Sequence, residues 1–453
     1  MPDTPFPSQE AVAVLDALLS RARKAGADQS DALALSSRSL AVGYRLGEPE
    51  QAERSESTVF GLRVLIGGRQ AAISTADTRP AALDEAADRA VAMAKAAPVD
   101  PSAGLADRVQ LAGDTDAAHL ELHDPAELDE DALKDLAKRA EDAALSVAGI
   151  TNSGGASAGA SHGWMALVTS TGFQGSYAGS EFSLGVSVLA GSDGGMERDY
   201  ATSSTRFAAA LEASEAVGRR AGERAVARLQ SSQPPTGRMP VVFHPRVANS
   251  LLSHFAQAVN GANIARGTSF LKDRMGESVF ADGISIVDDS LRPRGMRSRP
   301  FDAEGLLSQR LELVREGRLQ SWLLDCASAR KLGLESTGSA GRGISSPPSP
   351  GPTNLYMVPG VVTPDELLET IGDGIYVTEL IGMGVNPVTG DYSRGAAGFL
   401  IEGGVLGRPI SEFTLAGNLK SMFASLTPAS DLEFRYGVNA PTIAIPDMTI
   451  AGA

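Results

Sequence analysis

The chain has 453 residues, of which 43% are hydrophobic and 5% are aromatic, and its formal net charge is −15. This length predicts two substantial cores, while the negative charge argues against binding to nucleic acid or to anionic membranes. The single cysteine, Cys326, excludes an intramolecular disulfide and a multi-cysteine zinc cluster. The sequence shows neither a signal peptide nor an apolar run long enough to span a membrane, so we expect a cytoplasmic protein.

The first half of the chain predicts helices and antiparallel strands. The pair Gly67-Gly68 indicates a two-residue hairpin turn, and Asp124-Pro125 is a favourable start for a helix. After residue 161, alternating apolar residues between glycine-rich turns predict an antiparallel meander. The predicted helices are 8–25, 79–97, 124–148 and 208–230, the predicted strands are 59–66, 70–74, 164–170, 181–190 and 196–205, and 98–116 and 191–195 are a linker and a turn.

A domain boundary is predicted at SSQPPTG, residues 231–237, because proline, serine and glycine disfavour regular structure. We therefore expect an α+β protein of two lobes. The N-terminal lobe, 1–232, combines a helix and hairpin segment (about 8–100) with a central meander (about 110–230). The C-terminal lobe, 233–453, is β-rich, with hairpins around Glu316-Gly317 and Gly403-Gly404 and a helix opened by a capping box at Thr363 and Glu366.

The segment GVNPVTGDYSRG, residues 384–395, is too rich in glycine, proline, asparagine and aspartate for a helix or a long strand. It predicts a shaped loop in which Asn386-Pro387 starts a turn, Gly390 takes a positive φ and Asp391 caps the turn. The loop has two interpretations: a purely structural turn, or a cleft wall whose backbone pairs with an extended peptide.

This block, with the AGN at 416–418, resembles the C-terminal signature of the TldD/PmbA family, which pairs zinc peptidase subunits with sister subunits that lack the metal. Residues 169–195, 262–280 and 448–452 resemble the matching segments of PmbA-like chains. The resemblance spans nearly the whole chain, and it implies a two-lobed α+β fold of the TldD/PmbA type.

In the zinc-binding sisters of this family, a helix carries a His-Glu-x-x-x-His motif that holds zinc and supplies a base. The matching window here starts at Ser253 and ends at Ala258, with His254 in place of the glutamate. The sisters also supply a cysteine near the C-terminus, but residues 431–453 contain none, and Cys326 lies upstream in a predicted hairpin strand, where we expect it to be a small buried side chain. These departures match the metal-free PmbA/TldE branch.

The resemblance therefore implies a metal-free, TldE-like subunit of a cytoplasmic zinc metallopeptidase complex. Zinc and bond cleavage are expected in a TldD-like partner, with no cofactor and no catalytic residue in this chain, which would complete and gate a chamber for peptides and unfolded segments. The family's label, modulator of DNA gyrase, describes a phenotype and implies no contact with DNA. The expected surface for substrate or partner is formed by Asn386, Pro387, Thr389, Gly390, Asp391 and Ser393.

An alternative is a stand-alone, homodimeric peptide-binding or scaffold protein without protease activity. Three weaker motifs remain. His119 and His123 have metal-ligand spacing only if they lie on a helix, whereas a strand or loop is predicted there. Ser157 occupies the centre of a G-x-S-x-G pattern, which would suit a hydrolase, but a flexible loop is predicted there instead of a strand-turn-helix. Residues 338–343, GSAGRG, lack the Lys-Ser/Thr of a phosphate-binding loop.

Overall fold

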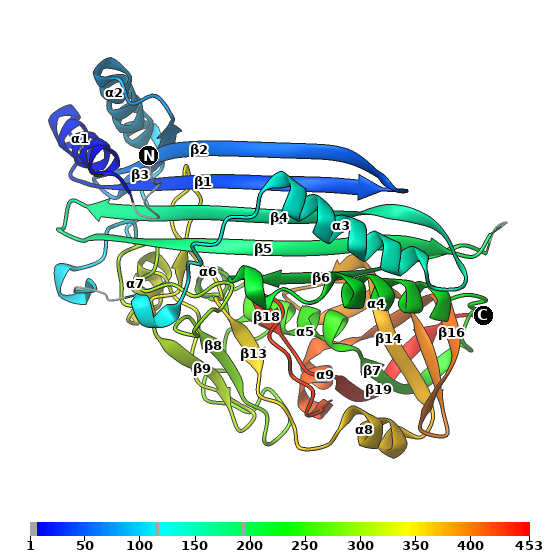
Figure 1. Cartoon of the computed structure of the whole chain (residues 1–453). Helices are drawn as coiled ribbons and strands as arrows, with labels where there is room; N and C mark the ends of the chain where they lie inside the picture. The colour runs from blue at the N-terminus through cyan, green and yellow to red at the C-terminus, as the bar shows by residue number, and fades with distance from the viewer. Residues whose placement is uncertain (1–6, 114–116, 193–194) are drawn as a thin grey trace.

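A computed structural model of the chain describes residues 7–113, 117–192 and 195–453 (Figure 1). It has the predicted α+β class, with helices, several sheets and a β-rich C-terminal half. Residues 1–6, part of the predicted linker at 98–116 and part of the predicted turn at 191–195 lie outside the described residues. Within the described ranges, no helix is long and apolar enough to cross a membrane.

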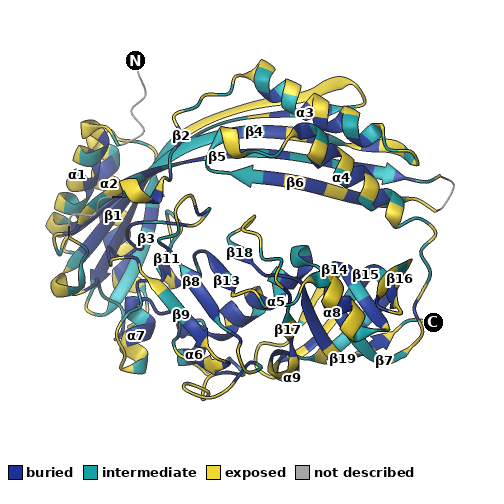
Figure 2. Cartoon of the chain, turned by 60° about the horizontal axis from the view of Figure 1, so that its bottom comes forward, coloured by how far each residue is buried: buried dark blue, intermediate teal, exposed yellow. Residues whose placement is uncertain are grey.

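The N-terminal half is a long antiparallel sheet of order β3-β2-β1-β4-β5-β6, covered on one face by four helices (Figures 1 and 2). On strand β4, Ala158 packs under α3 and α4, and Ala166 packs under α1 and α2. Both positions are even-numbered, so they lie on the same face of the strand. The elements are α1 Gln9–Ala25, β1 Gln29–Arg45, β2 Glu48–Ile66, β3 Arg69–Thr75, α2 Pro80–Ala96, η1 Arg108–Gln110, η2 Ala118–Leu120, α3 Glu130–Leu145, β4 Ile150–Thr169, β5 Gln174–Ala190, β6 Glu197–Thr205, η3 Ala208–Ala210 and α4 Ser214–Ala227.

Local signals placed several of these elements correctly. Ser8 caps α1 by accepting a hydrogen bond from the Ala11 N–H at 3.1 Å, and Gly26 ends the helix in the left-handed conformation. Gly67 and Gly68 have φ angles of 52° and 73° and turn the predicted hairpin between β2 and β3. The predicted helix at 79–97 is observed as α2.

Three predictions for this half are wrong. The helix predicted at 208–230 begins only at Ser214 as α4, and Ala208–Ala210 form the separate short helix η3. Helix α3 begins at Glu130 with Asp129 as its cap, because Asp124 is already bound to the backbone N–H groups of Ala126 and Ala208 at 3.0 and 2.8 Å. The glycine- and serine-rich stretch around Ser157, predicted as a flexible loop, belongs to β4 and is paired on both sides, with β1 and with β5. Its small residues let the helices and neighbouring strands approach closely.

The C-terminal half contains a sheet that closes on itself. Its order is β16-β15-β14-β7-β19-β17, and β16 also pairs with β19, so β16, β15, β14, β7 and β19 form a closed ring, and the short β17 pairs with β19 beside this ring. The hairpins predicted around Glu316-Gly317 and Gly403-Gly404 and the capping box of Thr363 and Glu366 are confirmed. The elements are β7 Gly237–Phe243, α5 Pro245–Ala258, α6 Gly261–Arg266, β8 Ile286–Asp289, β9 Arg310–Arg315, β10 Arg318–Leu319, α7 Cys326–Leu332, β11 Ala340–Gly341, β12 Ser349–Pro350, β13 Leu355–Met357, α8 Pro364–Ile371, β14 Gly374–Val385, β15 Asp391–Glu402, β16 Val405–Asn418, α9 Leu419–Ser425, β17 Thr427–Pro428, β18 Val438–Asn439 and β19 Ile443–Ala451.

Helix α5 is the central packing element of this half. His244 caps its start and Pro245 occupies its first turn, as the strand-then-proline pattern predicts. Leu251, Leu252 and Phe255 are each at most 1% exposed and belong to the largest hydrophobic cluster of the protein. The backbone of the helix is therefore held firmly between the ring of strands and the second sheet, β10-β9-β8-β13-β18.

A buried ion cluster joins the two halves at the helix-free face of the long sheet. Asp31 of β1 lies opposite Arg63 of β2, whose Nε donates to Asp31 Oδ2 at 2.7 Å. Arg342, from the C-terminal half, donates to the other oxygen of the same carboxylate. All three side chains are at most 3% exposed. Burial alone would raise the pKa of Asp31, but the two guanidinium groups outweigh burial and hold this pKa below its usual range.

The chain beside Arg342 fits closely against the sheet. A Cβ atom at Gly61 would lie 2.0 Å from the Ile344 carbonyl oxygen, so the contact requires glycine. Nearby, Leu33 and Leu167 of the sheet pack against Phe301 of the C-terminal half. The GSAGRG segment is therefore part of the contact between the halves.

We expect Asp31→Ala to lower the free energy of unfolding by about 3–5 kcal/mol, because it removes the buried carboxylate that the Arg63 and Arg342 guanidinium groups share. Denaturant unfolding followed by circular dichroism measures this loss. The matched control is Lys331→Ala, which removes the exposed Lys331–Asp100 ion pair between the same halves and should cost at most about 1 kcal/mol. Equal losses in the two variants would show that the buried cluster has no special role.

Candidate functional site

The predicted degenerate metal positions lie in the last turns of α5, and their side chains do not form a zinc site. Ser253 is exposed and its hydroxyl donates to the Asn249 carbonyl at 3.0 Å. Ala258 is 2% exposed and belongs to the core. In the part of the chain that the structure describes, no three His, Cys, Asp or Glu side chains come together to hold a metal ion. His254 alone does not supply the three protein ligands of a catalytic zinc.

His254 is half-buried and lies edge-on to Tyr392 of β15, with the ring centroids 6.1 Å apart. Its Nε2 and the Tyr392 hydroxyl are buried without a hydrogen-bond partner among the described residues. Burial, followed by the charge of Arg394, lowers the pKa of His254, and burial raises the pKa of Tyr392. The pair is therefore uncharged at neutral pH and forms a polar patch where the zinc-binding sisters are expected to hold their metal.

The block at 384–395 forms the tip of the β14–β15 hairpin. Residues 386–390 make the predicted turn, but the prediction of a loop is wrong for 384–385 and 391–395, which are paired strand in β14 and β15. The Asn386 side chain accepts hydrogen bonds from two backbone N–H groups of the turn, at 2.9 and 3.2 Å. Gly390 has a φ of 86°, so its predicted positive φ is observed. Asp391 accepts hydrogen bonds from the Thr389 hydroxyl at 2.6 Å and from the Asn418 side chain at 3.0 Å. These bonds join the block to the AGN segment and define the shape of the tip.

The tip presents both polar and apolar side chains at the surface. Asn386, Pro387, Thr389, Asp391 and Ser393 are exposed, whereas Gly390 is buried. Three large apolar side chains of the same hairpin are also exposed: Ile381 by 60%, Met383 by 87% and Val388 by 50%. Such a local concentration of exposed apolar groups is typical of an interaction surface.

Cys326 is the first residue of α7, so its predicted place in a hairpin strand is wrong. The side chain is 3% exposed, as expected for a small buried group, and the backbone N–H donates to Glu304 Oε2 at 2.7 Å. Burial, followed by the neighbouring Glu304, raises the pKa of the thiol. Because the thiolate is the form that binds metal and attacks substrates, this environment disfavours both roles.

The other two motifs do not assemble a site. His119 lies in the short helix η2, and His123 lies edge-on to His162, with the ring centroids 5.6 Å apart. Ser157 lies inside β4, opposite Gly43 and Gly185 of the neighbouring strands. It is therefore not at the strand-to-helix turn that a nucleophile elbow requires.

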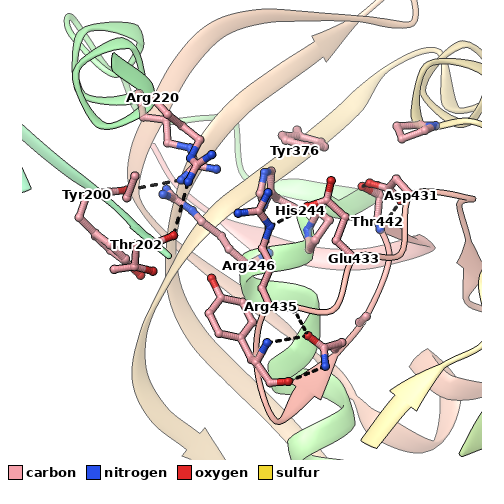
Figure 3. Close-up of a pocket in the computed structure, with 17 residues that line it drawn as sticks. Tyr200, Thr202, Arg220, His244, Arg246, Tyr376, Asp431, Glu433, Arg435 and Thr442 are labelled. Atoms are coloured by element: carbon pink, nitrogen blue, oxygen red, sulfur yellow. Dashed lines mark hydrogen bonds and ion pairs between the residues drawn. The ribbon is translucent and has the colours of Figure 1, made fainter. Parts of the chain in front are cut away.

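A pocket between the two halves, which the sequence analysis did not find, gathers basic side chains (Figure 3). Its volume is about 360 Å³, and it lies between β6 and α4 on one side and the start of α5, β14 and residues 431–442 on the other. The basic residues that line it are Arg220, Arg224, His244, Arg246 and Arg435.

Three of the four arginines in this pocket are paired with carboxylates. Arg246 forms a two-pronged ion pair with Asp199, at 2.6 and 2.9 Å. Arg220 binds Glu212 at 2.6 Å, and Arg435 binds the same carboxylate at 2.9 Å. These pairs hold the guanidinium groups in fixed positions around the pocket.

His244 is the cap of α5 and is uncharged. Its Nδ1 accepts a hydrogen bond from the Arg246 backbone N–H at 3.0 Å, which places the hydrogen of the neutral ring on Nε2. Burial, followed by the charges of Arg224 and Arg246, lowers the pKa of His244 to about 3. The ring therefore remains a neutral hydrogen-bond donor at neutral pH.

Comparisons with known proteins agree with this architecture. Three family models match the chain: PmbA/TldA metallopeptidase domain 1 over residues 31–94, the central domain over 123–229 and the C-terminal domain over 236–452. The chain therefore belongs to the PmbA/TldD family of metallopeptidase-like proteins. Metalloprotease PmbA of Escherichia coli O157:H7 is 37% identical over 415 residues, which cover 91% of this chain and 90% of that protein.

Two proteins of Haemophilus influenzae resemble the chain to different degrees. Its metalloprotease PmbA homolog is 37% identical over 95% of this chain and 94% of that protein, and its metalloprotease TldD homolog is 28% identical over 59% and 61%. Among solved structures, a candidate modulator of DNA gyrase from Bacteroides thetaiotaomicron has a TM-score of 0.90 at 25% identity and covers 98% of this chain and 100% of that chain. TldE from Thermococcus kodakarensis has a TM-score of 0.85 at 20% identity, covers 97% and 100%, and shows the shared fold.

We expect His244 to make the protein less stable as the pH falls. Between the ordinary histidine pKa of about 6.5 and the folded value of about 3, the unfolded chain binds a proton that the folded chain does not. Below pH 6.5 the folded state therefore loses about 1.4 kcal/mol per pH unit, which gives about 2 kcal/mol between pH 7 and pH 5. His244→Asn keeps a capping side chain and removes this titration, so unfolding of both proteins at pH 7, 6 and 5 measures the effect. If the unfolding free energies of the two proteins fell equally with pH, the lowered pKa of His244 would be contradicted.

Proposed function

We propose that this chain is the metal-free, TldE-like subunit of a zinc metallopeptidase complex that processes peptides and unfolded segments. The observation that carries the proposal is the set of side chains on α5 at the positions of the family's metal-binding motif. Ser253 points to solvent, Ala258 packs in the core and His254 faces Tyr392, so this helix lacks the ligands expected in the zinc-binding sisters. On this proposal, zinc and bond cleavage belong to a TldD-like partner, and the complex is cytoplasmic.

The family comparison supports the same branch. Within Haemophilus influenzae, the PmbA homolog matches more of this chain, at higher identity, than the TldD homolog does. The name metalloprotease that these relatives carry describes their family. The side chains at the motif positions of α5 suggest that, within this family, zinc binding and cleavage belong to a different type of subunit. The chain would then contribute shape and binding surface, and the partner would contribute the chemistry.

The hairpin tip at 384–395 is the proposed surface for partner or substrate. Its backbone is held by the Asn386 and Asp391 side chains, while Met383 and Val388 remain exposed. A rigid turn with exposed apolar side chains loses little conformational freedom on binding, which favours association. In this role the tip would help to close and gate the chamber of the complex.

Reconstitution tests the proposal. The purified chain is mixed with a TldD-like zinc subunit, and the mixture is examined by size exclusion, casein digestion and elemental analysis. We expect comigration and peptidase activity only in the mixture, and stoichiometric zinc only with the partner. A chain that remains a separate homodimer would support the alternative of a peptide-binding scaffold, and stoichiometric zinc or casein digestion by the chain alone would refute the metal-free assignment.

A substitution at the hairpin tip tests the proposed surface. Met383→Asp places a charge in the apolar part of the tip, and we expect it to weaken association with the zinc subunit at least about tenfold, as is typical when an interface anchor is lost. Val361→Asp is the matched control, because Val361 is 96% exposed on a different part of the same half. Equal dissociation constants for the two variants, measured by surface plasmon resonance, would place the interface elsewhere.

A further inference from the structure

Arg224 differs from the other arginines of the pocket because no carboxylate among the described residues lies within ion-pair distance of it. It donates a weak hydrogen bond from Nη1 to the Tyr200 carbonyl at 3.4 Å. The side chain is half-buried in the pocket, and burial, followed by the charge of Arg246, lowers its pKa. A partly buried cation beside other cations is costly unless an anion balances it.

Several arginine charges also act on His244. After burial, the charges of Arg224, Arg246 and Arg435 lower the pKa of His244, whereas the charge of Asp199 raises it. Two carboxylates line the pocket itself: Asp431 is held by the Thr442 backbone N–H and hydroxyl at 2.8 and 2.7 Å, and Glu433 is paired with Arg435 at 2.6 Å. With these carboxylates bound elsewhere, this end of the pocket offers the Arg224 guanidinium and the His244 Nε2–H as donors.

The pocket continues as a groove along α5. A second cavity of about 260 Å³ shares Tyr200 and Arg246 with the first, and Asn249 and Ser250 from the next turn of the helix also line it. Arg394, the residue whose charge affects His254, also lines this cavity. The two cavities together follow α5 from His244 to Ser250.

We propose that the pocket binds the C-terminal carboxylate of a peptide, with Arg224 and His244 as its donors. A guanidinium presents two parallel N–H groups that match the two oxygens of a carboxylate. The preceding residues of the peptide would lie in the second cavity, beside α5. This inference rests on the proposed function, because it identifies which part of a peptide the metal-free subunit holds.

The dimensions are suitable for a short extended segment. The α5 residues that line the two cavities run from His244 to Ser250, a rise of about 9 Å, which corresponds to about three residues of extended chain. The wall opposite α5 is formed by β6, an edge strand of the long sheet, whose Tyr200 and Thr202 carbonyls already accept hydrogen bonds from Arg224 and Arg220. A free inorganic anion would use the first cavity alone.

The test compares two forms of one peptide on the full chain without a partner. An N-terminally fluorescein-labelled, unstructured octapeptide of uncharged residues is prepared with a free C-terminal carboxylate and with a C-terminal amide. We expect the free acid to bind at least about tenfold more tightly by fluorescence anisotropy, because the amide loses a charge-assisted hydrogen bond. Arg224→Gln should remove this preference and leave the affinity for the amide unchanged, which also shows that the variant is folded.

The matched control is Arg219→Gln, which removes one positive charge from the same helix at an exposed position. It should leave the preference for the free acid intact. Equal affinities of acid and amide, absence of binding by both peptides, or equal effects of the two substitutions would overturn the inference. Competition by inorganic phosphate that depends on Arg224, without any preference for the free acid, would instead identify a site for small anions and would also overturn it. The proposed function is judged separately, by reconstitution with the zinc subunit.

Discussion

The arrangement of the molecule depends on one buried carboxylate, Asp31, that is shared by two guanidinium groups from different halves of the chain. Arg63 lies opposite it on the neighbouring strand, and Arg342 reaches it from a loop of the C-terminal half. The desolvation of these charges is costly, so the cluster tolerates only the geometry in which all three groups meet. Glu304, whose pKa is raised to about 7 by burial and by Asp302, adds a further acidic group near Arg63. The cluster thus determines how the helix-free face of the long sheet lies against the C-terminal half.

This fixed contact creates the groove between the halves. Strand β6 and helix α4 belong to one side of the groove, and α5 belongs to the other, so the ion pairs that cross the groove form only when the halves meet. The ion pair between Arg246 of α5 and Asp199 of β6 crosses the same boundary. Helix α5 therefore has two roles, which different residues carry. Its apolar face forms the core of the C-terminal half, and its start and polar face line the groove.

Much of the fold could be predicted from local signals, and the failures have physical causes. Gly67-Gly68 and Thr363 with Glu366 act through the backbone of their own turn, so their sequence suffices. Asp124 resembled a helix cap, but it binds the distant Ala208 N–H, which is a tertiary contact. Strand β1, residues 29–45, gives no clear strand signal, and the stretch around Ser157 predicts a loop, because alanine, serine and glycine replace the usual β-branched residues. These strands are stabilised by pairing on both sides and by the helices above them, not by their own propensity.

The candidate sites also differ in whether adjacent residues or tertiary contacts define them. A family motif made of adjacent residues, such as the window from Ser253 to Ala258, can be compared position by position, and its loss of metal donors is visible before the fold is known. The arginine pocket cannot be found in this way, because Arg224, His244 and Arg435 come from separate segments and are unremarkable in their own contexts. What distinguishes Arg224 is a missing counter-charge, and that property exists only once Glu212 and Asp199 have been taken by other arginines. In a subunit proposed to lack the metal, binding must come from donors such as Arg224 that have no carboxylate partner and from shaped surfaces. On that argument, the groove along α5 is where this half of the complex would recognise its peptide.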